Sequence, residues 1–450
     1  MPNSRDQRRR HAAPRSKESG RLANEQRLVD LGEAIDKRNG VKKSSRRSTT
    51  RAGSAQRAGT FRLPFRVKRR VVAIVAITCA VLAGGVIGGS YIYTRVIYDR
   101  IQKITVNADT PVIPGQPFNV LDIGSDSRAG LSGAVAAQTG ASSGLTAGQR
   151  SDVIKIMHFI PSNGTVQVIS IPRDLVVQLL PAAAAYFQNH LGKINATYFQ
   201  GPDLLVQTIQ KTFGIPINYV VQVGFAGVMN IAEALGGVYL NFPYPSRDAW
   251  SGLTITHPGC QLVSGFQALA VARSRHFEYF YQGAWHGDGL SDISRIQRQD
   301  QFIRGMVTQA KKQYNPVVLA SALSKIPEGL VIDSRLSLGQ LIGMAMKFHG
   351  VSGPKFQTYT LPFVRAGNVP YVGDSLVEQE PQAQELLVSI FGSQLTTPTL
   401  LPIGLDHQPF MPPTIAPPKA TPGHPLKPGN PATVPTAAAD VSEFFNPMAC

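Results

Sequence analysis

Hydrophobic positions repeat with strand and helix periods between about residues 118 and 361, which predicts a folded α/β domain. Two strand-like runs, Asp152–Phe159 and Thr165–Ile171, are joined by the hairpin-like Pro161–Gly164. This hairpin argues against a purely parallel sheet, so we expect a single α-β-α domain with a mixed central sheet. Other strands are expected at Phe118–Gly124, Tyr219–Val223, Val238–Asn241 and Phe356–Leu361, and helices at Asp203–Phe213, Ala226–Leu235, Gly265–Arg275, Asp292–Lys312 and Leu336–His349.

An uncharged apolar run precedes this domain. Val71–Tyr93 contains 23 residues without a charge and directly follows Lys68-Arg69-Arg70. As a helix it is about 34 Å long, enough to cross a hydrocarbon core of roughly 30 Å. The charged region before it is too long for a cleaved signal peptide. We therefore predict one transmembrane helix in the cell membrane, with residues 1–70 cytoplasmic and the α/β domain extracytoplasmic.

The remaining segments complete the expected organisation. Residues 94–117 are predicted to form a stalk, residues 118–395 the α/β domain and residues 396–450 a Pro/Thr/Ala-rich tail with a docking patch at Phe444-Phe445. Ala129–Gly148 lacks any periodicity and is expected to be a long loop. Cys260 and Cys450 fall in the disulfide-permissive compartment, but the sequence does not decide whether they pair.

Charge is concentrated at the N-terminus. The formal net charge is +17, yet residues 1–70 hold 21 Lys and Arg against 6 Asp and Glu, and residues 71–450 hold 24 against 22. The tail has few aromatic residues and is expected to be disordered. Such a tail is usually solvated or attracted to an anionic membrane surface, or it contacts a cytoplasmic partner. We expect no nucleic-acid partner.

Arginine recurs beside aspartate where elements begin and end, whereas no convincing Ser-His-Asp order, Walker loop or zinc-spaced cluster is present. One pattern is helical: Asp292, Arg295 and Gln299 follow the spacing i, i+3 and i+7, which places them on one face. The full set of these groups is Asp126 with Arg128, Arg150-Ser-Asp152, Arg173-Asp174, Arg273-Ser-Arg275 and Asp292-Ile-Ser-Arg295-Ile-Gln-Arg298-Gln299.

These groups have the chemistry of a pyrophosphate site. Strand ends and helix starts are where open α/β sheets bind ligands. Guanidinium groups bind phosphate oxygens in pairs, and carboxylates suit Mg²⁺ completed by substrate phosphates. The alternative is that each pair is a surface ion pair, with Asp292 a simple helix cap. Residue chemistry alone leaves both interpretations open.

The order of these motifs resembles the LytR-CpsA-Psr family. Three further segments match its pattern, Lys193-Ile-Asn195-Ala, Ala234-Leu-Gly-Gly237-Val and Leu262-x-x-Gly265-x-Gln-Ala-Leu269. The resemblance covers about residues 117–315. It implies an enzyme that takes a glycan linked to polyprenyl pyrophosphate and, with Mg²⁺ (Mn²⁺ is also suitable), passes the glycan phosphate to a hydroxyl of peptidoglycan.

The resemblance also assigns roles to residues. It implies that Asp126 and Asp152 hold the metal and that Arg173, Asp152 and Arg150 are catalytic. Arg298 and Asp174 are expected to be structural. The residues expected to bind the pyrophosphate are Arg150, Arg173, Arg273, Arg275, Arg295 and Gln299.

Two departures and two rival functions remain. His276–Ser291 is long and aromatic, so it is either a lid or acceptor-binding loop, or a surface excursion. The apolar stretch Val220–Tyr244 either lines a tunnel for a lipid or is plain core. The same site with water as acceptor makes a polyprenyl-pyrophosphate phosphatase. A non-catalytic membrane sensor of lipid-linked precursor is the other rival.

Overall fold

The computed structural model describes residues 89, 91–107, 110–127, 131, 135–136, 139, 151–312, 324, 326–409 and 444–450. All of them belong to one compact unit, Ile77–Cys450. The basic tail, most of the predicted span Val71–Tyr93, most of the loop Ala129–Gly148 and Arg150 lie outside the described residues. Within the described part of the chain, no helix combines the length and apolar character needed to cross a membrane.

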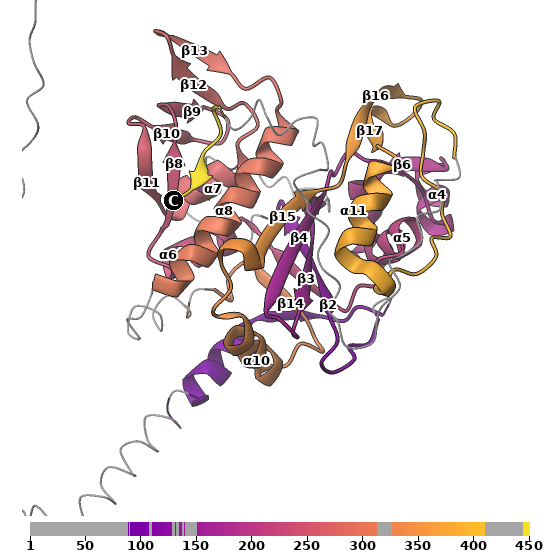
Figure 1. The fold of residues 1–450 in the computed structure, drawn as a ribbon, viewed down its shortest axis with the longest axis horizontal. Helices are drawn as coiled ribbons and strands as arrows, with labels where there is room; N and C mark the ends of the chain where they lie inside the picture. Colours follow the sequence, from indigo (N-terminus) through magenta and orange to yellow (C-terminus); the bar gives the residue numbers. More distant parts are fainter. Residues whose placement is uncertain are drawn as a thin grey trace, which may run out of the picture. The chain divides into compact units, whose positions relative to one another are not determined.

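A seven-stranded mixed sheet forms the centre of this unit (Figure 1), as the sequence predicted. Three neighbouring pairs are parallel, β1 with β14, β7 with β2 and β4 with β15, and the others are antiparallel. Along the sheet the order is β1 (Gln102–Ile104), β14 (Leu330–Asp333), β7 (Tyr219–Val223), β2 (Phe118–Ser125), β3 (Ser151–Ile160), β4 (Thr165–Ile171) and β15 (Phe356–Thr360). β1 lies within the predicted stalk, so this segment contributes a strand to the sheet.

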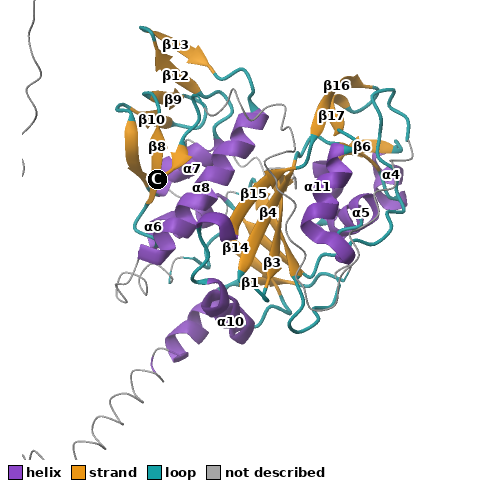
Figure 2. Cartoon of the chain, in the orientation of Figure 1, coloured by secondary structure: helices purple, strands orange, loops and turns teal. Residues whose placement is uncertain are grey.

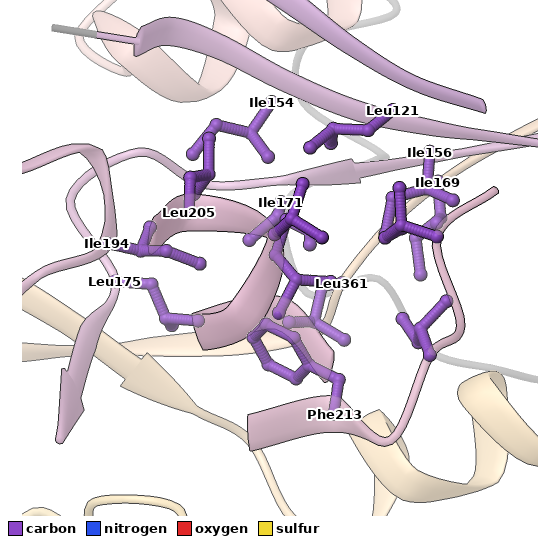
Figure 3. Packing of buried hydrophobic residues seen from close by; sticks show 14 of the residues in the cluster. Leu121, Ile154, Ile156, Ile169, Ile171, Leu175, Ile194, Leu205, Phe213 and Leu361 are labelled. Atoms are coloured by element: carbon purple, nitrogen blue, oxygen red, sulfur yellow. The ribbon is translucent and has the colours of Figure 1, made fainter. Parts of the chain in front are cut away.

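Helices cover both faces of the sheet (Figure 2). On one face α5 (Pro202–Phe213) and α11 (Gln382–Phe391) pack on alternate residues of β2, β3 and β4. Figure 3 shows part of this core, a cluster of buried side chains that includes Leu121, Ile154 and Phe213. On the other face lie α8 (Asp292–Lys312) and α10 (Leu338–Phe348). Every residue of β4 is buried, because this strand has helices on both sides.

A second core lies beside the sheet, around α6 (Phe225–Ala234) and α7 (Gly265–Arg273). Three residues of the apolar stretch, Val238, Leu240 and Phe242, are fully buried in it, so this part of the stretch is packed core. Its strands are β11 (Gly259–Val263), β8 (Val238–Phe242) and β18 (Met448–Ala449) in one sheet, and β10 (Leu253–Ile255), β9 (Ser246–Asp248), β12 (Glu278–Tyr281) and β13 (Ala284–Gly287) in another.

Smaller elements follow the C-terminal end of β4. Two hairpins, β5–β6 and β16–β17, are joined by an isolated bridge between Leu175 and Leu376. The elements in this region are β5 (Val176–Gln178), α4 (Pro181–Phe187), β6 (Leu191–Lys193), η2 (Ile194–Gln200), β16 (Phe363–Val369) and β17 (Gly373–Glu378). Two further 3₁₀ turns are η3 (Gly353–Lys355) and η4 (Gly392–Gln394).

The C-terminus returns to the domain through a covalent bond. Cys260 of β11 and Cys450 form a disulfide across a sequence separation of 190 residues. Between them β18 pairs with β8, and the Phe445 ring stacks on Tyr279 at 5.2 Å. Phe445 is buried in the second core, which confirms the predicted docking patch. The sequence alone had left the pairing of Cys260 with Cys450 undecided.

Removing the disulfide should destabilise the domain. The double variant Cys260→Ser/Cys450→Ser should lose about 2–4 kcal/mol in free energy of unfolding, because a long loop is no longer closed in the unfolded chain. Urea unfolding of the wild-type and variant proteins measures the loss. Reduction should weaken the wild-type protein to the same extent and leave the variant unchanged. Equal stability of both proteins would show that the C-terminal strand is held without the disulfide.

His158 should make stability depend on pH. It lies on β3 and is buried against α11, with Nδ1 2.7 Å from the Asn119 Oδ1 and its ring edge-on to Phe391. Burial lowers its pKa from 6.5 to about 4. The folded protein therefore keeps His158 neutral, and its contribution is complete above pH 6.5 and lost as the pH falls toward 4. The loss is about 3 kcal/mol.

The measurement is the free energy of unfolding against pH for wild-type protein and His158→Gln. The advantage of the wild-type protein should shrink between pH 6.5 and 4. His349→Gln is the matched control for replacing a histidine by glutamine, because His349 is exposed just after α10. A constant difference for His158→Gln would contradict the assigned cause.

Candidate active site

Asp292, the first residue of α8, is the centre of a cluster of guanidinium groups. Its Oδ2 accepts a hydrogen bond from the Arg173 Nε at 2.7 Å and lies 3.2 Å from the Arg295 Nη2. Its Oδ1 accepts from the Arg275 Nε at 2.5 Å. Asp292 therefore connects Arg173 after β4, Arg275 after α7 and Arg295 of α8. It does more than cap the helix. It is a site residue that the expected ligand set did not include.

Asp152 enters the same cluster from β3. Its carboxylate accepts a hydrogen bond from the Arg173 Nη1, and its backbone oxygen accepts from the Arg295 Nη2 at 3.1 Å. The pairing of β2 with β3 shifts register between Gly124 and Ser125, opposite Asp152. Such bulges redirect a side chain at a functional edge. Glycine is required at position 124, because an added Cβ would lie 2.5 Å from the Val153 Cβ.

A third carboxylate, Asp174, lies beside Arg173. It is 3.3 Å from the Arg173 Nε, and its other oxygen is 3.0 Å from the Lys193 Nζ. Lys193 belongs to the Lys-Ile-Asn-Ala motif, whose place in the site only the fold reveals. Arg173 is thus surrounded by three carboxylates, those of Asp152, Asp174 and Asp292.

The electrostatic environment shifts the pKa values of Arg173 and Arg295 in opposite directions. Burial lowers the pKa of Arg173, but Asp292, Asp152 and Asp174 together raise it above its usual value. Burial dominates for Arg295 and lowers its pKa, although Asp292 opposes the shift. Arg275 is about one-third exposed. Arg173 and Arg275 are therefore the groups best placed to meet an incoming anion, and Arg295 supports them from beneath.

Arg275 is positioned by Asp248 at the end of β9. The Asp248 Oδ2 accepts from the Ser274 Oγ at 2.6 Å, from the Arg275 N at 2.9 Å and from the His276 N at 3.0 Å. Burial raises the pKa of Asp248, but hydrogen bonds from the Ser274 hydroxyl and from the backbone N–H groups of His276, Ser251 and Trp250 lower it below its usual value. No spacing in the sequence connects Asp248 with this turn, so sequence reasoning missed it.

Arg298 is structural, as expected. It is fully buried, donates to the Ser274 backbone oxygen at 2.8 Å and to the Asn446 Oδ1 at 2.6 Å, and lies 3.1 Å from Asp288. Burial lowers its pKa to about 10. Through Arg298 the C-terminal segment supports the turn that carries Arg275.

Two expected pyrophosphate ligands have other surroundings. The Gln299 side chain is buried and its Nε2 donates to the Ala272 backbone oxygen at 2.9 Å, so it ties α8 to α7. The Arg273 guanidinium lies over the Phe225 ring, 4.6 Å from its centroid. The i, i+3, i+7 face of α8 therefore points into the protein at Gln299 and reaches the cluster only at Asp292 and Arg295.

The expected metal carboxylates share one edge of the sheet. Asp126 follows β2, Asp152 is the second residue of β3, and Ser125 is paired with Ser151 between them. Two carboxylates at adjoining strand ends fit Mg²⁺, which normally takes one or two of them and completes its shell with phosphate oxygens and water. Across the described ranges, no group of three or more His, Cys, Asp and Glu side chains could hold a metal ion.

The segment His276–Ser291 forms a hairpin rather than an irregular loop. β12 and β13 pair antiparallel, and β12 also pairs with β9. The Trp285 ring lies 4.0 Å from the Arg247 guanidinium, and Tyr279 packs on Phe445. The hairpin is thus anchored at its base to the second core.

The fold and the site together define a class of protein. An α/β domain with a mixed sheet gathers arginines and carboxylates at one sheet edge, which is the arrangement expected for binding phosphates. Residues 94–386 match the LytR_cpsA_psr family. This chain belongs to the LytR-CpsA-Psr family.

Individual relatives agree with this assignment. The probable cell wall biosynthesis protein LcpB of Corynebacterium glutamicum is 30% identical over 212 residues, 47% of this chain and 46% of that protein. The polyisoprenyl-teichoic acid–peptidoglycan teichoic acid transferase TagV of Bacillus subtilis is 24% identical over 71% of this chain and 76% of that protein. The match to LcpB thus spans about half of that relative's length.

A solved structure supports the fold. The LytR-Csp2A-Psr enzyme from Actinomyces oris superposes with a TM-score of 0.52 at 22% identity, covering 67% of this chain and 98% of that one. At this identity the likeness concerns the fold alone.

Replacing Asp292 should destabilise the protein. Asp292→Ala removes a shared acceptor of three guanidinium groups, one of them on the buried Arg295, so the free energy of unfolding should fall by about 2–3 kcal/mol. Chemical denaturation measures this loss. The control is Asp99→Ala, which breaks the half-exposed pair with Arg95 and should cost less than about 0.5 kcal/mol. Similar losses in both variants would show that the Asp292 cluster is no stronger than a surface ion pair.

Proposed function

We propose that this protein transfers a phosphate-linked glycopolymer from a polyprenyl-pyrophosphate carrier to a hydroxyl of peptidoglycan. The observation that carries the proposal is the set of three arginines, Arg173, Arg275 and Arg295, gathered around Asp292 beside Asp152. Family membership supports it, and so does the similarity to TagV and to TagU from Bacillus cereus, both named as polyisoprenyl-teichoic acid–peptidoglycan teichoic acid transferases.

The reaction follows from the charges. The acceptor oxygen bonds to the phosphorus nearest the glycan, the bond from this phosphorus to the bridging oxygen breaks, and polyprenyl monophosphate leaves. The hydroxyl proton is released to water. Negative charge grows on the leaving phosphate, and preorganised guanidinium groups stabilise it. Arg173 and Arg275 contact the pyrophosphate, while Arg295 and Asp292 hold both arginines in place.

We further propose that Asp126 and Asp152 hold a divalent cation, Mg²⁺ or Mn²⁺. When bound, this ion neutralises phosphate charge. Without substrate the Asp152 carboxylate is occupied by Arg173, so the two charges balance each other. Pyrophosphate binding would separate them, releasing Arg173 to the phosphate and Asp152 to the cation. Arg150, two residues before Asp152, is proposed as a further phosphate ligand.

We propose a location in the cell membrane, with the catalytic domain outside and the basic tail in the cytoplasm. The uncharged run Val71–Tyr93 and its basic flank support this orientation. The disulfide between Cys260 and Cys450 supports an oxidising compartment for the domain. In the cytoplasm the tail would be available to anionic lipids or to a protein partner.

A transfer assay tests the proposal. Purified full-length protein is incubated with Mg²⁺, a short-chain polyprenyl-pyrophosphate glycan and peptidoglycan fragments, and mass spectrometry follows the products. Arg173→Ala should reduce formation of the glycan-phosphate-peptidoglycan adduct by roughly a hundredfold or more, because a charge-stabilising donor is lost. Arg365→Ala is the matched control, since Arg365 is exposed on β16. Chelation should stop the reaction and added Mg²⁺ should restore it.

Other outcomes identify the rivals. Lipid monophosphate and free glycan phosphate without an adduct would indicate a phosphatase. Tight binding of the lipid-linked glycan with no turnover would indicate a sensor. Full activity of Arg173→Ala would reject the proposed site.

A further inference from the structure

A cleft of about 700 Å³ opens beside the Arg173 cluster. Its charged end consists of Arg173, Asp174 and Lys193. The cleft is therefore continuous with the candidate active site, and its volume is in the range of small-molecule sites. The walls come from the β5–α4–β6 region and η2 on one side, and from the turn between β16 and β17 on the other.

One wall of the cleft is aromatic. The Tyr186 ring stacks on Phe199 with centroids 4.3 Å apart, and Phe187 lies edge-on to both at 4.9 and 5.1 Å. Tyr186 is nevertheless 64% exposed and Phe187 39% exposed. These rings are held in place by one another, yet much of their surface faces solvent. A rigid, exposed aromatic surface next to a charged site is a feature of ligand recognition rather than of core packing.

Tyr371 contributes a second aromatic ring from the β16–β17 turn. It is 99% exposed and has a φ of +62°, a conformation that is rare for a bulky residue. Glycine would adopt this turn without strain, so a tyrosine here needs a reason beyond the turn itself. A contact with a ligand in the cleft supplies one.

A buried polar side chain also lines the cleft. Asn195 is 7% exposed, and its backbone N donates to the Arg173 backbone oxygen at 3.2 Å. Its side-chain amide can donate and accept hydrogen bonds, so it suits a ligand with hydroxyl or amide groups.

We infer that this cleft is a glycan subsite that binds pyranose rings next to the reacting phosphate, an inference that rests on the proposed transferase function. Pyranoses present apolar C–H faces, which pack on aromatic rings such as Tyr186, and polar edges, which hydrogen-bond to groups such as Asn195. Arg173 at the charged end sets the distance between the bound sugar and the pyrophosphate. The glycan is either the donor's own sugar or the acceptor strand of peptidoglycan, since both offer the same chemistry.

Calorimetry on the full-length protein tests the subsite. The ligand is a peptidoglycan-derived tetrasaccharide of alternating N-acetylglucosamine and N-acetylmuramic acid. Tyr186→Ala should weaken binding about tenfold, because a buried aromatic contact is lost. Tyr186→Phe keeps the ring and should stay within about twofold. The matched control is Tyr239→Ala, because Tyr239 is 40% exposed on β8, outside the cleft lining, and this variant should bind as wild type.

Michaelis constants in the transfer assay separate the two sources of the glycan. If Tyr186→Ala raises only the Michaelis constant for the peptidoglycan acceptor, the cleft binds peptidoglycan. If it raises only the Michaelis constant for the lipid-linked glycan, the cleft binds the donor. If Tyr186→Ala leaves saccharide affinity and both constants unchanged in an active transferase, the subsite is rejected and the proposed function stands. Tyr186-dependent saccharide binding by a protein without transfer activity would support the subsite and reject the function. An equal loss in Tyr239→Ala would reject the subsite as well.

Discussion

The ion pair between Lys155 and Asp300 holds in place the helix on which the site depends. The Lys155 Nζ on β3 lies 2.5 Å from the Asp300 Oδ1 on α8 and donates to the Ser170 Oγ at 2.6 Å, and both charged side chains are buried. The neighbouring strand places Asp122 opposite Lys155, where burial raises the pKa of Asp122 to about 6. A pair buried this deeply has few alternative arrangements, because separating the charges would leave each without a partner.

Fixing α8 in this way determines what its two ends can do. Phe302 packs in the second core and Ile303 packs against the sheet, so the helix joins the two parts of the domain. At its N-terminus this places Asp292 among three guanidinium groups, and nearly two turns later Arg298 binds the C-terminal segment through Asn446. The cluster balances charge while no substrate is bound. An anionic substrate can then exchange with carboxylates already in position, which limits the reorganisation that binding requires.

The disulfide between Cys260 and Cys450 also supports the arginine cluster, through the C-terminal segment. The strand β18 has only two residues, which pair with β8, and the disulfide of Cys450 adds a covalent anchor. The anchored segment carries Asn446 to Arg298, which binds the Ser274 backbone oxygen next to Arg275. The cleft for which a glycan is proposed lies beside Arg173, among β5, α4 and η2. The site is therefore supported on one side by packed structure and open on the other to the proposed glycan.

The sequence by itself determined the mixed α/β class and the limits of α8 and β4, and it placed Arg173 and Asp152 among the candidate site residues that the structure brings together. These follow from local periodicity and from motif order, which act over short stretches of chain. The sequence missed α11, the β16–β17 hairpin and the role of Asp248, and it left the pairing of Cys260 and Cys450 open. It also assigned Gln299 to the ligand set, where the structure uses its amide to tie two helices together. Only the tertiary structure could decide these points, because each depends on contacts between residues far apart in the chain, and local spacing carries no information about which distant groups meet.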